Sequence, residues 1–295
     1  MGSGGLGGGG VLSYRMHRVT SARAKDTGSG LWLLPFAISS ASLMLLDNVV
    51  FSYLHKNDSW RLVKVLALAG GHNIYATEES GPILNTMYGP IGELAFIPVV
   101  AARLAGEYMP TVAMMLGSLT AAVIFFAPVA LLLLLAIPEG GKRSSQANTI
   151  ALAIFALYFL SVGFSVPLSS SAFRPHPDAP ALGFMTAAIA LAISKHGRTS
   201  IYWTALACLF AVFAVWSKQV VAVPLMVLPV YLAYRDGVRS AARFVAVLGG
   251  VAAVVSIPIV FIFGPSQLWL NLVKIPGGFP LNHQPAHKAV AAMAR

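Results

Sequence analysis

The stretch that decides the fold is PTVAMMLGSLTAAVIFFAPVALLLLLAI, residues 110–137, which contains no charged side chain. A helix needs roughly 17–25 apolar residues to cross the hydrocarbon core of a bilayer, and this run is long enough. Six other apolar runs are near or above that length, at residues 31–54, 147–167, 178–194, 199–217, 218–234 and 241–264. The sequence therefore predicts an all-α fold, a polytopic membrane bundle of about seven transmembrane helices.

The composition also favours a membrane protein. Of the 295 residues, 57% are hydrophobic and only 10% are charged, whereas about a quarter of an ordinary soluble domain is charged. The net charge of +10 comes from Lys and Arg spread thinly between apolar runs, and no basic stripe interleaves with aromatic residues. We therefore expect no nucleic-acid partner. Cys208, the single cysteine, lies in an apolar run and is expected to be a packing residue.

The basic connections predict the orientation, because Lys and Arg concentrate in cytoplasmic loops. Basic residues occur in the N-terminal tail and in the connections 139–146, 195–198 and 234–243. These four regions share one side of the membrane only if residues 88–106, YGPIGELAFIPVVAARLAG, do not cross it. We therefore expect 88–106 to form a helix at the outer face and the N-terminus of the chain to lie in the cytoplasm. The membrane is expected to be a bacterial inner (plasma) membrane.

This topology divides the chain into three parts. Residues 1–30 are expected to be a flexible basic cytoplasmic tail, 31–265 a transmembrane domain, and 266–295 an outer C-terminal segment. The transmembrane domain carries a long outer loop at 55–109, in which SWRLVKVLALAGGHN, residues 59–73, is amphipathic. Its pattern predicts a helix lying on the membrane surface, ended by Gly70-Gly71.

Most acidic residues fall on the predicted outer face. Carboxylates at membrane level are costly and are functional candidates by default. The outer group comprises Asp47, Asp58, Glu78, Glu79, Glu93, Glu107 and Asp178.

Three segments of the chain resemble segments of a known enzyme family, and they occur in the same order. The outer loop, with an acidic residue before an amphipathic helix, then GGHNIY at 70–75 and YGP at 88–90, is similar to the start of GT-C polyprenyl-phosphate-sugar glycosyltransferases. FRPHPDAPAL at 173–182 resembles the RPD segment of their protein-mannosyltransferase-like branch, family 39, and AVWSKQVVAVPL at 214–225 is similar to its TK segment. The resemblance covers roughly residues 31–265. Family members are commonly longer, so this chain could be a product truncated at its C-terminus, a fragment or a short member of the family.

The resemblance implies a membrane enzyme whose site opens on the periplasmic or lumenal side. Such an enzyme takes a sugar from a polyprenyl-phosphate carrier and passes it to a hydroxyl of a glycan, lipid or protein acceptor. A carboxylate in the first outer loop accepts the proton of that hydroxyl. Some members also use a divalent cation, so Mg²⁺ or Mn²⁺ stays open as a cofactor, and no residue of this chain is assigned to a metal.

The resemblance also implies site residues. Asp58 matches the catalytic acidic residue, although the family usually has Asp-Glu where this chain has Asp58-Ser59; Asp47 is the fallback. Asp178 matches the aspartate of RPD. For both Asp58 and Asp178 the alternative is a helix N-cap, a position that Asp favours.

Four further residues are expected to bind substrate. Arg174 could bind a phosphate or form an ion pair with Asp178. Lys218 suits the phosphate of a lipid donor, or is a lysine that snorkels to the interface. Tyr88 lines the acceptor cleft or is an interfacial aromatic residue, and Glu93 lies on the outer-face helix.

Two other functions compete with glycosyl transfer. A secondary transporter would place ionisable residues at mid-membrane on broken helices, often in two similar halves, and no clear internal repeat is visible. A non-catalytic membrane fragment of a glycosyltransferase would tolerate replacement of both Asp58 and Asp178.

Overall fold

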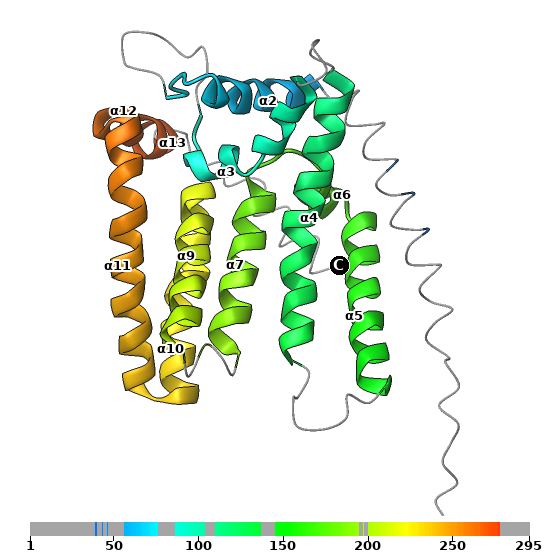
Figure 1. The fold of residues 1–295 in the computed structure, drawn as a ribbon, viewed down its shortest axis with the longest axis vertical. Helices are drawn as coiled ribbons and strands as arrows, with labels where there is room; N and C mark the ends of the chain where they lie inside the picture. The colour runs from blue at the N-terminus through cyan, green and yellow to red at the C-terminus, as the bar shows by residue number, and fades with distance from the viewer. Residues whose placement is uncertain are drawn as a thin grey trace, which may run out of the picture.

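The computed structural model describes residues 56–75, 86–103, 110–136, 145–194, 197 and 200–277, with the isolated residues 39, 43 and 46. These residues form helices and no strands, which confirms the all-α prediction for the described part of the chain. Figure 1 shows upright helices side by side, with one helix lying across their ends. The predicted first span, 31–54, and the tail lie outside the described residues apart from the isolated positions.

The upright helices make up most of the molecule (Figure 1). Two of them contain stretches long and apolar enough to cross a membrane, at Thr111–Leu133 and Val238–Phe263. Shorter apolar stretches lie at Ile150–Phe164, Asp178–Ile193 and Ile201–Ser217. The upright helices are α4 (Pro110–Ala136), α5 (Ser145–Phe164), α7 (Asp178–Ile193), α9 (Ile201–Ser217), α10 (Ala222–Asp236) and α11 (Val238–Phe263).

The predicted amphipathic helix is present as α2 (Lys56–Ala69), which lies across one end of the bundle (Figure 1). It ends at Gly70-Gly71 as predicted. The His72 N–H donates to the Ala67 carbonyl at 2.9 Å, and Gly71 has φ +78°, a conformation that favours glycine.

The prediction of one helix over 88–106 is wrong. The chain forms a short α-helix, α3 (Pro90–Leu94), and then a 3₁₀ helix, η1 (Ile97–Arg103). Pro98 has no N–H to donate to the preceding turn, so a continuous α-helix cannot run through this position undisturbed. Both pieces belong to the same end of the bundle as α2.

Residues 168–177, which connect the expected spans 147–167 and 178–194 and were expected to form an outer loop, are mostly helical. A break at Ser165 ends α5, and α6 (Val166–Phe173) follows with Pro167 at its start, where proline is tolerated. Arg174 is extended, as residues before proline usually are. The true loop is only the four residues from Arg174 to Pro177, so Asp178 is held on a short tether.

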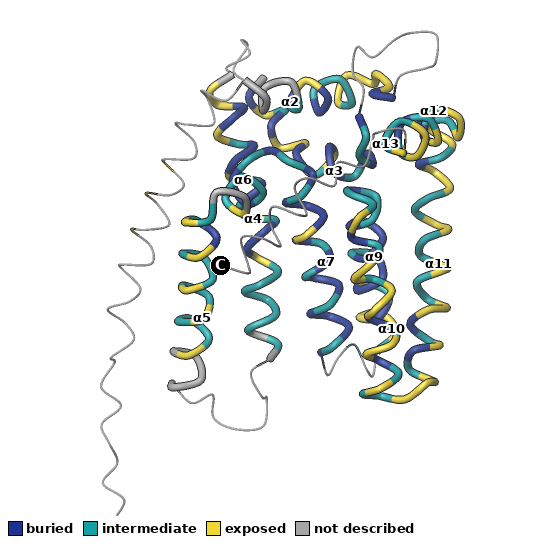
Figure 2. The backbone as a smooth tube through the Cα atoms, turned by 180° about the vertical axis from the view of Figure 1, so that it is seen from behind, coloured by how far each residue is buried: buried dark blue, intermediate teal, exposed yellow. Residues whose placement is uncertain are grey.

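The centre of the bundle is α7, which packs between α4 and α9. Its buried face is rich in Ala and Gly, which lets the backbones approach closely. A Cβ at Gly183 would lie 2.1 Å from the Ile124 carbonyl oxygen of α4. Figure 2 shows α7 mostly buried, whereas α10 and α11 carry long exposed stretches.

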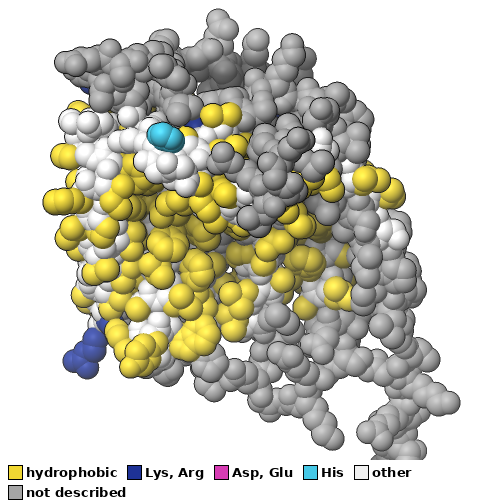
Figure 3. Space-filling view, turned by 45° about the horizontal axis from the view of Figure 1, so that its top comes forward, with side chains coloured by type: hydrophobic (Ala, Val, Ile, Leu, Met, Phe, Trp, Pro, Cys, Tyr) yellow, Lys and Arg dark blue, Asp and Glu magenta, His cyan; other side chains and the backbone are white. Residues whose placement is uncertain are grey.

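The exposed sides of α10 and α11 are apolar. Phe261 is 91% exposed, and the space-filling view in Figure 3 shows a broad hydrophobic flank with a basic side chain at its lower edge. Other exposed apolar residues on these two helices are Val223, Met226, Val227, Val230, Val254, Ile257 and Ile262. Such a continuous apolar flank is typical of a surface that contacts lipid or protein.

The last described residues form short helices at the end of the bundle that carries α2 (Figure 1). Gly264 has φ +80° and turns the chain out of α11. The following elements are α12 (Pro265–Trp269), the π-helix η3 (Leu270–Lys274) and α13 (Ile275–Gly277). A 3₁₀ turn, η2 (Gln219–Val221), joins α9 to α10.

Candidate functional site

The YGP, RPHPD and WSK segments meet where α3 rests on the end of α9. A Cβ at Gly89 would lie 1.8 Å from the Trp216 carbonyl oxygen, so only glycine allows this approach. A Cβ at Gly92 would lie 3.0 Å from the Ser217 carbonyl oxygen and 3.3 Å from Cβ of Pro177. Three segments that are far apart in the sequence therefore touch at the same end of the bundle.

The centre of this site is an ion pair between Asp178 and Lys218. The Lys218 ammonium bonds to Oδ1 of Asp178, and the Ser171 hydroxyl donates to Oδ2 at 3.1 Å. The side chains of Asp178 and Lys218 are 23% and 24% exposed, so both charges are partly desolvated yet reachable from solvent. Ion pairs in such surroundings hold their partners firmly, because leaving one charge alone is costly.

Asp178 is not the N-cap of its helix. It is the first residue of α7, Pro177 holds the cap position, and no side-chain capping bond is made. The N-cap alternative for Asp178 is therefore wrong, and its carboxylate is engaged by Lys218 and Ser171 instead.

Lys218 points into the site. Its backbone is extended between α9 and η2, and its Nζ lies 5.5 Å from the centroid of the Tyr88 ring, within reach of a cation–π contact. These two contacts, to Asp178 and Tyr88, are not those of a lysine that snorkels into water. The Tyr88 ring also meets the His176 ring edge-on, with centroids 6.1 Å apart.

His176 adds a titratable group that the sequence prediction did not assign. Its Nδ1 lies 3.2 Å from the Asp178 backbone nitrogen and 3.1 Å from Oδ2 of the same residue. A neutral imidazole can accept the backbone N–H there, and a protonated one can donate to the carboxylate. Ser171 was also missed; nothing in the run of three serines distinguishes it, since its role depends on where α6 ends.

The GGHNIY segment holds the backbone of Tyr88 in place through a hydrogen bond from Tyr75. The Tyr75 hydroxyl donates to the Tyr88 carbonyl at 2.8 Å, and the Tyr75 N–H donates to Oδ1 of Asn73 at 2.9 Å. The Asn73 amide in turn donates to the Phe263 carbonyl at 3.4 Å. The resemblance pointed to this segment as a motif, and the structure gives it a bracing role between YGP and the end of α11.

Asp58 and Asp47 are the two candidates for the catalytic base. Asp47 and the side chain of Asp58 lie outside the described residues. The backbone places Asp58 in the first turn of α2, which begins at Lys56, and therefore inside the helix rather than at its N-cap. One turn further along, Leu62 lies 3.5 Å and Pro175 3.3 Å from the position of a Cβ on Gly117. This half of α2 thus lies near the RPHPD loop.

Of the two roles expected for Arg174, the ion pair with Asp178 is not formed, and the phosphate contact stays a prediction. Among the described residues, Asp178 bonds to Ser171, His176 and Lys218, and Arg174 is not a partner. The chain turns between Arg174 and Asp178, where the His176 N–H donates to the Arg174 carbonyl at 2.6 Å and Pro177 is already helical. The cation that reaches the carboxylate is Lys218, at the end of α9.

Glu93 lies beneath α2 rather than at an accessible surface. It is 3% exposed, and Lys64 of α2, which is 1% exposed, is an electrostatic neighbour together with Arg61. Burial raises the pKa of Glu93 to about 7, although both cations lower it. Burial lowers the pKa of Lys64 to about 8, partly offset by Glu93. The pair sits between α2 and α3, where it couples α2 to the segment that carries Tyr88.

The Glu93 pKa predicts a pH-dependent stability. A carboxyl group with a folded pKa of about 7, against 4.5 normally, stabilises the fold below pH 4.5 and loses this contribution as the pH rises through 7. We expect the free energy of unfolding of the wild type to fall by about 3 kcal/mol relative to Glu93→Gln over that range. Unfolding by denaturing detergent at several pH values measures this. Parallel curves for the two proteins would contradict it.

Asp178 is not suited to be a ligand of a divalent cation. Its two carboxylate oxygens face the Lys218 ammonium and the Ser171 hydroxyl, and a nearby ammonium disfavours a second cation. Within the described residues, no group of three or more His, Cys, Asp or Glu side chains could hold a metal ion. Asp178 is therefore not expected to hold Mg²⁺ or Mn²⁺.

Comparison with protein-family models, with curated proteins and with solved structures finds no match to this chain.

Proposed function

We propose that the protein is a membrane glycosyltransferase that moves a sugar from a polyprenyl-phosphate carrier to an acceptor hydroxyl on the outer face of the membrane. The observation that carries this proposal is the meeting of Tyr88, Asp178 and Lys218. They come from the three segments that resemble the GT-C family, and they lie together at one end of the bundle.

The proposal places the chain in a bacterial inner membrane as a bundle of about seven spans. The two long apolar helices and the exposed apolar flank of α10 and α11 support it. The basic connections put the N-terminus in the cytoplasm and the α2 end of the bundle outside. That end carries the Asp178–Lys218 pair at helix termini, which favours an enzyme over a secondary transporter with charges at mid-membrane.

The proposed roles follow from the contacts. Asp178 is held by an ammonium and a hydroxyl, so it is a poor proton acceptor and serves to fix Lys218. Lys218 has three N–H donors, which leaves donors for the phosphate oxygens of the carrier. Asp58, on α2 above the site, takes the role of general base.

The proposed step is a nucleophilic displacement at the anomeric carbon of the sugar. The acceptor oxygen forms a bond to that carbon while the bond from the carbon to the phosphate oxygen breaks. The acceptor proton passes to the Asp58 carboxylate, and polyprenyl phosphate leaves with the bonding electron pair. Lys218 stabilises the charge that gathers on the leaving phosphate.

The test is sugar transfer by the purified wild-type protein. Undecaprenyl-phosphate carrying radiolabelled mannose, glucose or galactose is supplied with an envelope extract as acceptor. We expect one of these donors to lose its label to a product that no longer extracts with the lipid carrier. If none of the three donors binds to the protein and none of them reacts, the proposal is overturned.

A further inference from the structure

His176 lies against both of the groups that position the Lys218 ammonium. Its ring meets the Tyr88 ring edge-on, with centroids 6.1 Å apart, and its Nδ1 lies next to Asp178. The Tyr88 ring and the Asp178 carboxylate are the two groups that Lys218 contacts. A change at His176 therefore acts on Lys218 through Asp178 and Tyr88.

The Nδ1 atom of His176 has two hydrogen-bond partners within reach on the same residue. The Asp178 backbone nitrogen lies at 3.2 Å and Oδ2 of Asp178 at 3.1 Å. A ring nitrogen accepts from the N–H only when it has no proton, and donates to the carboxylate only when it carries one. The two bonds therefore exclude each other, and a proton on Nδ1 changes the partner of the ring without moving the ring.

In the neutral form, His176 completes the start of α7. Asp178 is the first residue of this helix, and the N–H groups of a first turn have no partner within the helix. Pro177, in the cap position, makes no side-chain capping bond. The imidazole nitrogen supplies the acceptor instead, so His176 fixes the backbone from which the Asp178 side chain extends to Lys218.

In the protonated form, His176 binds the carboxylate itself. Oδ2 of Asp178 already accepts the Ser171 hydroxyl at 3.1 Å, and a carboxylate oxygen can accept a second donor. The imidazolium then shares Asp178 with Lys218, whose ammonium bonds to Oδ1. Because two cations now divide the negative charge of Asp178, Lys218 is held less tightly and the site gains one positive charge.

The added charge acts in a partly desolvated place. The side chains of His176, Asp178 and Lys218 are 18%, 23% and 24% exposed, so solvent reaches the ring while screening by salt stays incomplete. The gain of one charge holds whatever charge the neighbours carry. The other charged and titratable residues of the loop and of the elements packed against it are Tyr88, Arg174, Glu93 of α3, and Lys56, Asp58, Arg61 and Lys64 of α2.

We propose that His176 is a positioning residue that sets how strongly this site binds the phosphate of the lipid donor. Neutral, it holds the backbone of Asp178; protonated, it shares the carboxylate with Lys218 and adds attraction for an anion. The phosphodiester of such a donor carries one negative charge at every pH of the test, so a change in its binding comes from the protein. The inference rests on the proposed function, in which Lys218 binds that phosphate.

The test measures the dissociation constant of the undecaprenyl-phosphate sugar that the wild type accepts, with the full chain in neutral-detergent micelles. The pH is varied between about 5 and 8, the range over which histidine changes charge. We expect binding by the wild type to weaken about fivefold or more as the pH rises, because the site loses one partly desolvated charge.

His176→Asn places an amide where Nδ1 lies, so it keeps an acceptor for the Asp178 N–H but does not titrate. We expect its binding to change less than about twofold over the same range and to match the wild type at about pH 8. A loss of structure alone would weaken binding at both ends of the range. His176→Gln is a second variant that does not titrate, should His176→Asn be unstable.

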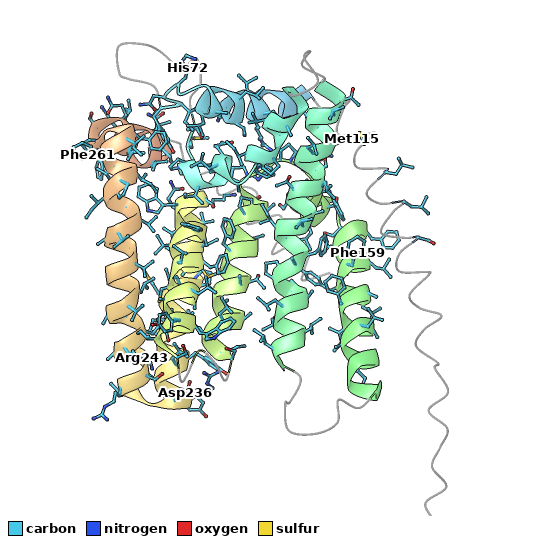
Figure 4. The ribbon with its side chains drawn as sticks, viewed as in Figure 1. His72, Met115, Phe159, Asp236, Arg243 and Phe261 are labelled. Carbon is cyan, nitrogen blue, oxygen red and sulfur yellow. The ribbon has the colours of Figure 1, made fainter. Side chains whose placement is uncertain are left out.

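His72→Asn is the matched control, since it removes an exposed histidine from the same end of the molecule (Figure 4). Glu93→Gln removes the other nearby group that titrates in this range, with a pKa of about 7. Both controls should keep the pH dependence of the wild type. Its loss in either control would overturn the proposal.

The outcome also separates this inference from the proposed function. If the wild type transfers sugar but its donor binding does not change with pH, or if His176→Asn keeps the wild-type pH dependence or binds weakly at both ends of the range, the role of His176 alone is wrong. If the wild type neither binds nor transfers any of the donors, the proposed function is wrong and the role of His176 with it.

Discussion

Replacement of Lys218 with methionine is expected to reduce sugar transfer about a hundredfold or more, the usual loss when one donor to a developing oxyanion is removed. Methionine keeps the length and apolar stem of the side chain but has no ammonium. The carrier phosphate would lose a cationic partner, and the Tyr88 ring would lose the charge that now lies 5.5 Å from its centroid. Transfer rates at saturating donor measure the effect.

The same substitution leaves the Asp178 carboxylate without its ammonium partner. We expect a loss of about 1–2 kcal/mol in stability, less than for a fully buried pair because both side chains are about a quarter exposed. The double variant Asp178→Asn/Lys218→Met should recover most of that stability without recovering transfer. Lys274→Met, which removes an exposed lysine from the same end of the molecule, is the control. Equal activity of Lys218→Met and Lys274→Met would refute the role of Lys218.

Gly89→Ala is expected to destabilise the protein by about 2–3 kcal/mol and to impair transfer as well. The added Cβ would lie 1.8 Å from the Trp216 carbonyl oxygen, which is fixed backbone and not the end of a flexible side chain. Either α3 lifts away from α9 or the YGP segment shifts, and both movements separate Tyr88 from Lys218. Thermal unfolding and transfer by the folded fraction measure the two effects.

Gly249→Ala is the matched control for Gly89→Ala. Gly249 lies within α11, and a Cβ there meets no atom within 4 Å. Alanine favours a helix over glycine by about 0.5–1 kcal/mol, so this variant should be as stable as the wild type or more so. If Gly89→Ala were as stable as Gly249→Ala, the close contact between α3 and α9 would not exist in solution.

Much of the fold could be predicted from the sequence because hydrophobic length and helix-end signals are local. The run at 110–137, the helix that ends at Gly70-Gly71 and the boundaries of α9 are all found close to where they were expected. The errors occur where prolines decide between a helix and a turn. Pro98 divides the expected outer-face helix, and Pro167 begins a new helix where a loop was expected.

The site could be predicted only in outline. Motif order pointed to Tyr88, Asp178 and Lys218, which the fold brings together. Their partners depend on packing between distant elements: Lys218, and not Arg174, reaches Asp178 because α9 ends beside the start of α7. The surroundings of Glu93 could not be predicted. Its place on the expected outer-face helix suggested substrate binding, but Glu93 is 3% exposed and Lys64 of α2 is its electrostatic neighbour.

The most direct measurement compares sugar transfer by purified wild type, Asp58→Asn and Asp178→Asn with one accepted polyprenyl-phosphate sugar. Asparagine has the shape of aspartate but cannot accept the acceptor proton, so Asp58→Asn should lose about a hundredfold or more in rate. Asp178→Asn should lose activity mainly through weaker binding of the donor, because Lys218 is no longer held. Full activity in both variants would contradict the assignment of this end of the bundle as the site of glycosyl transfer.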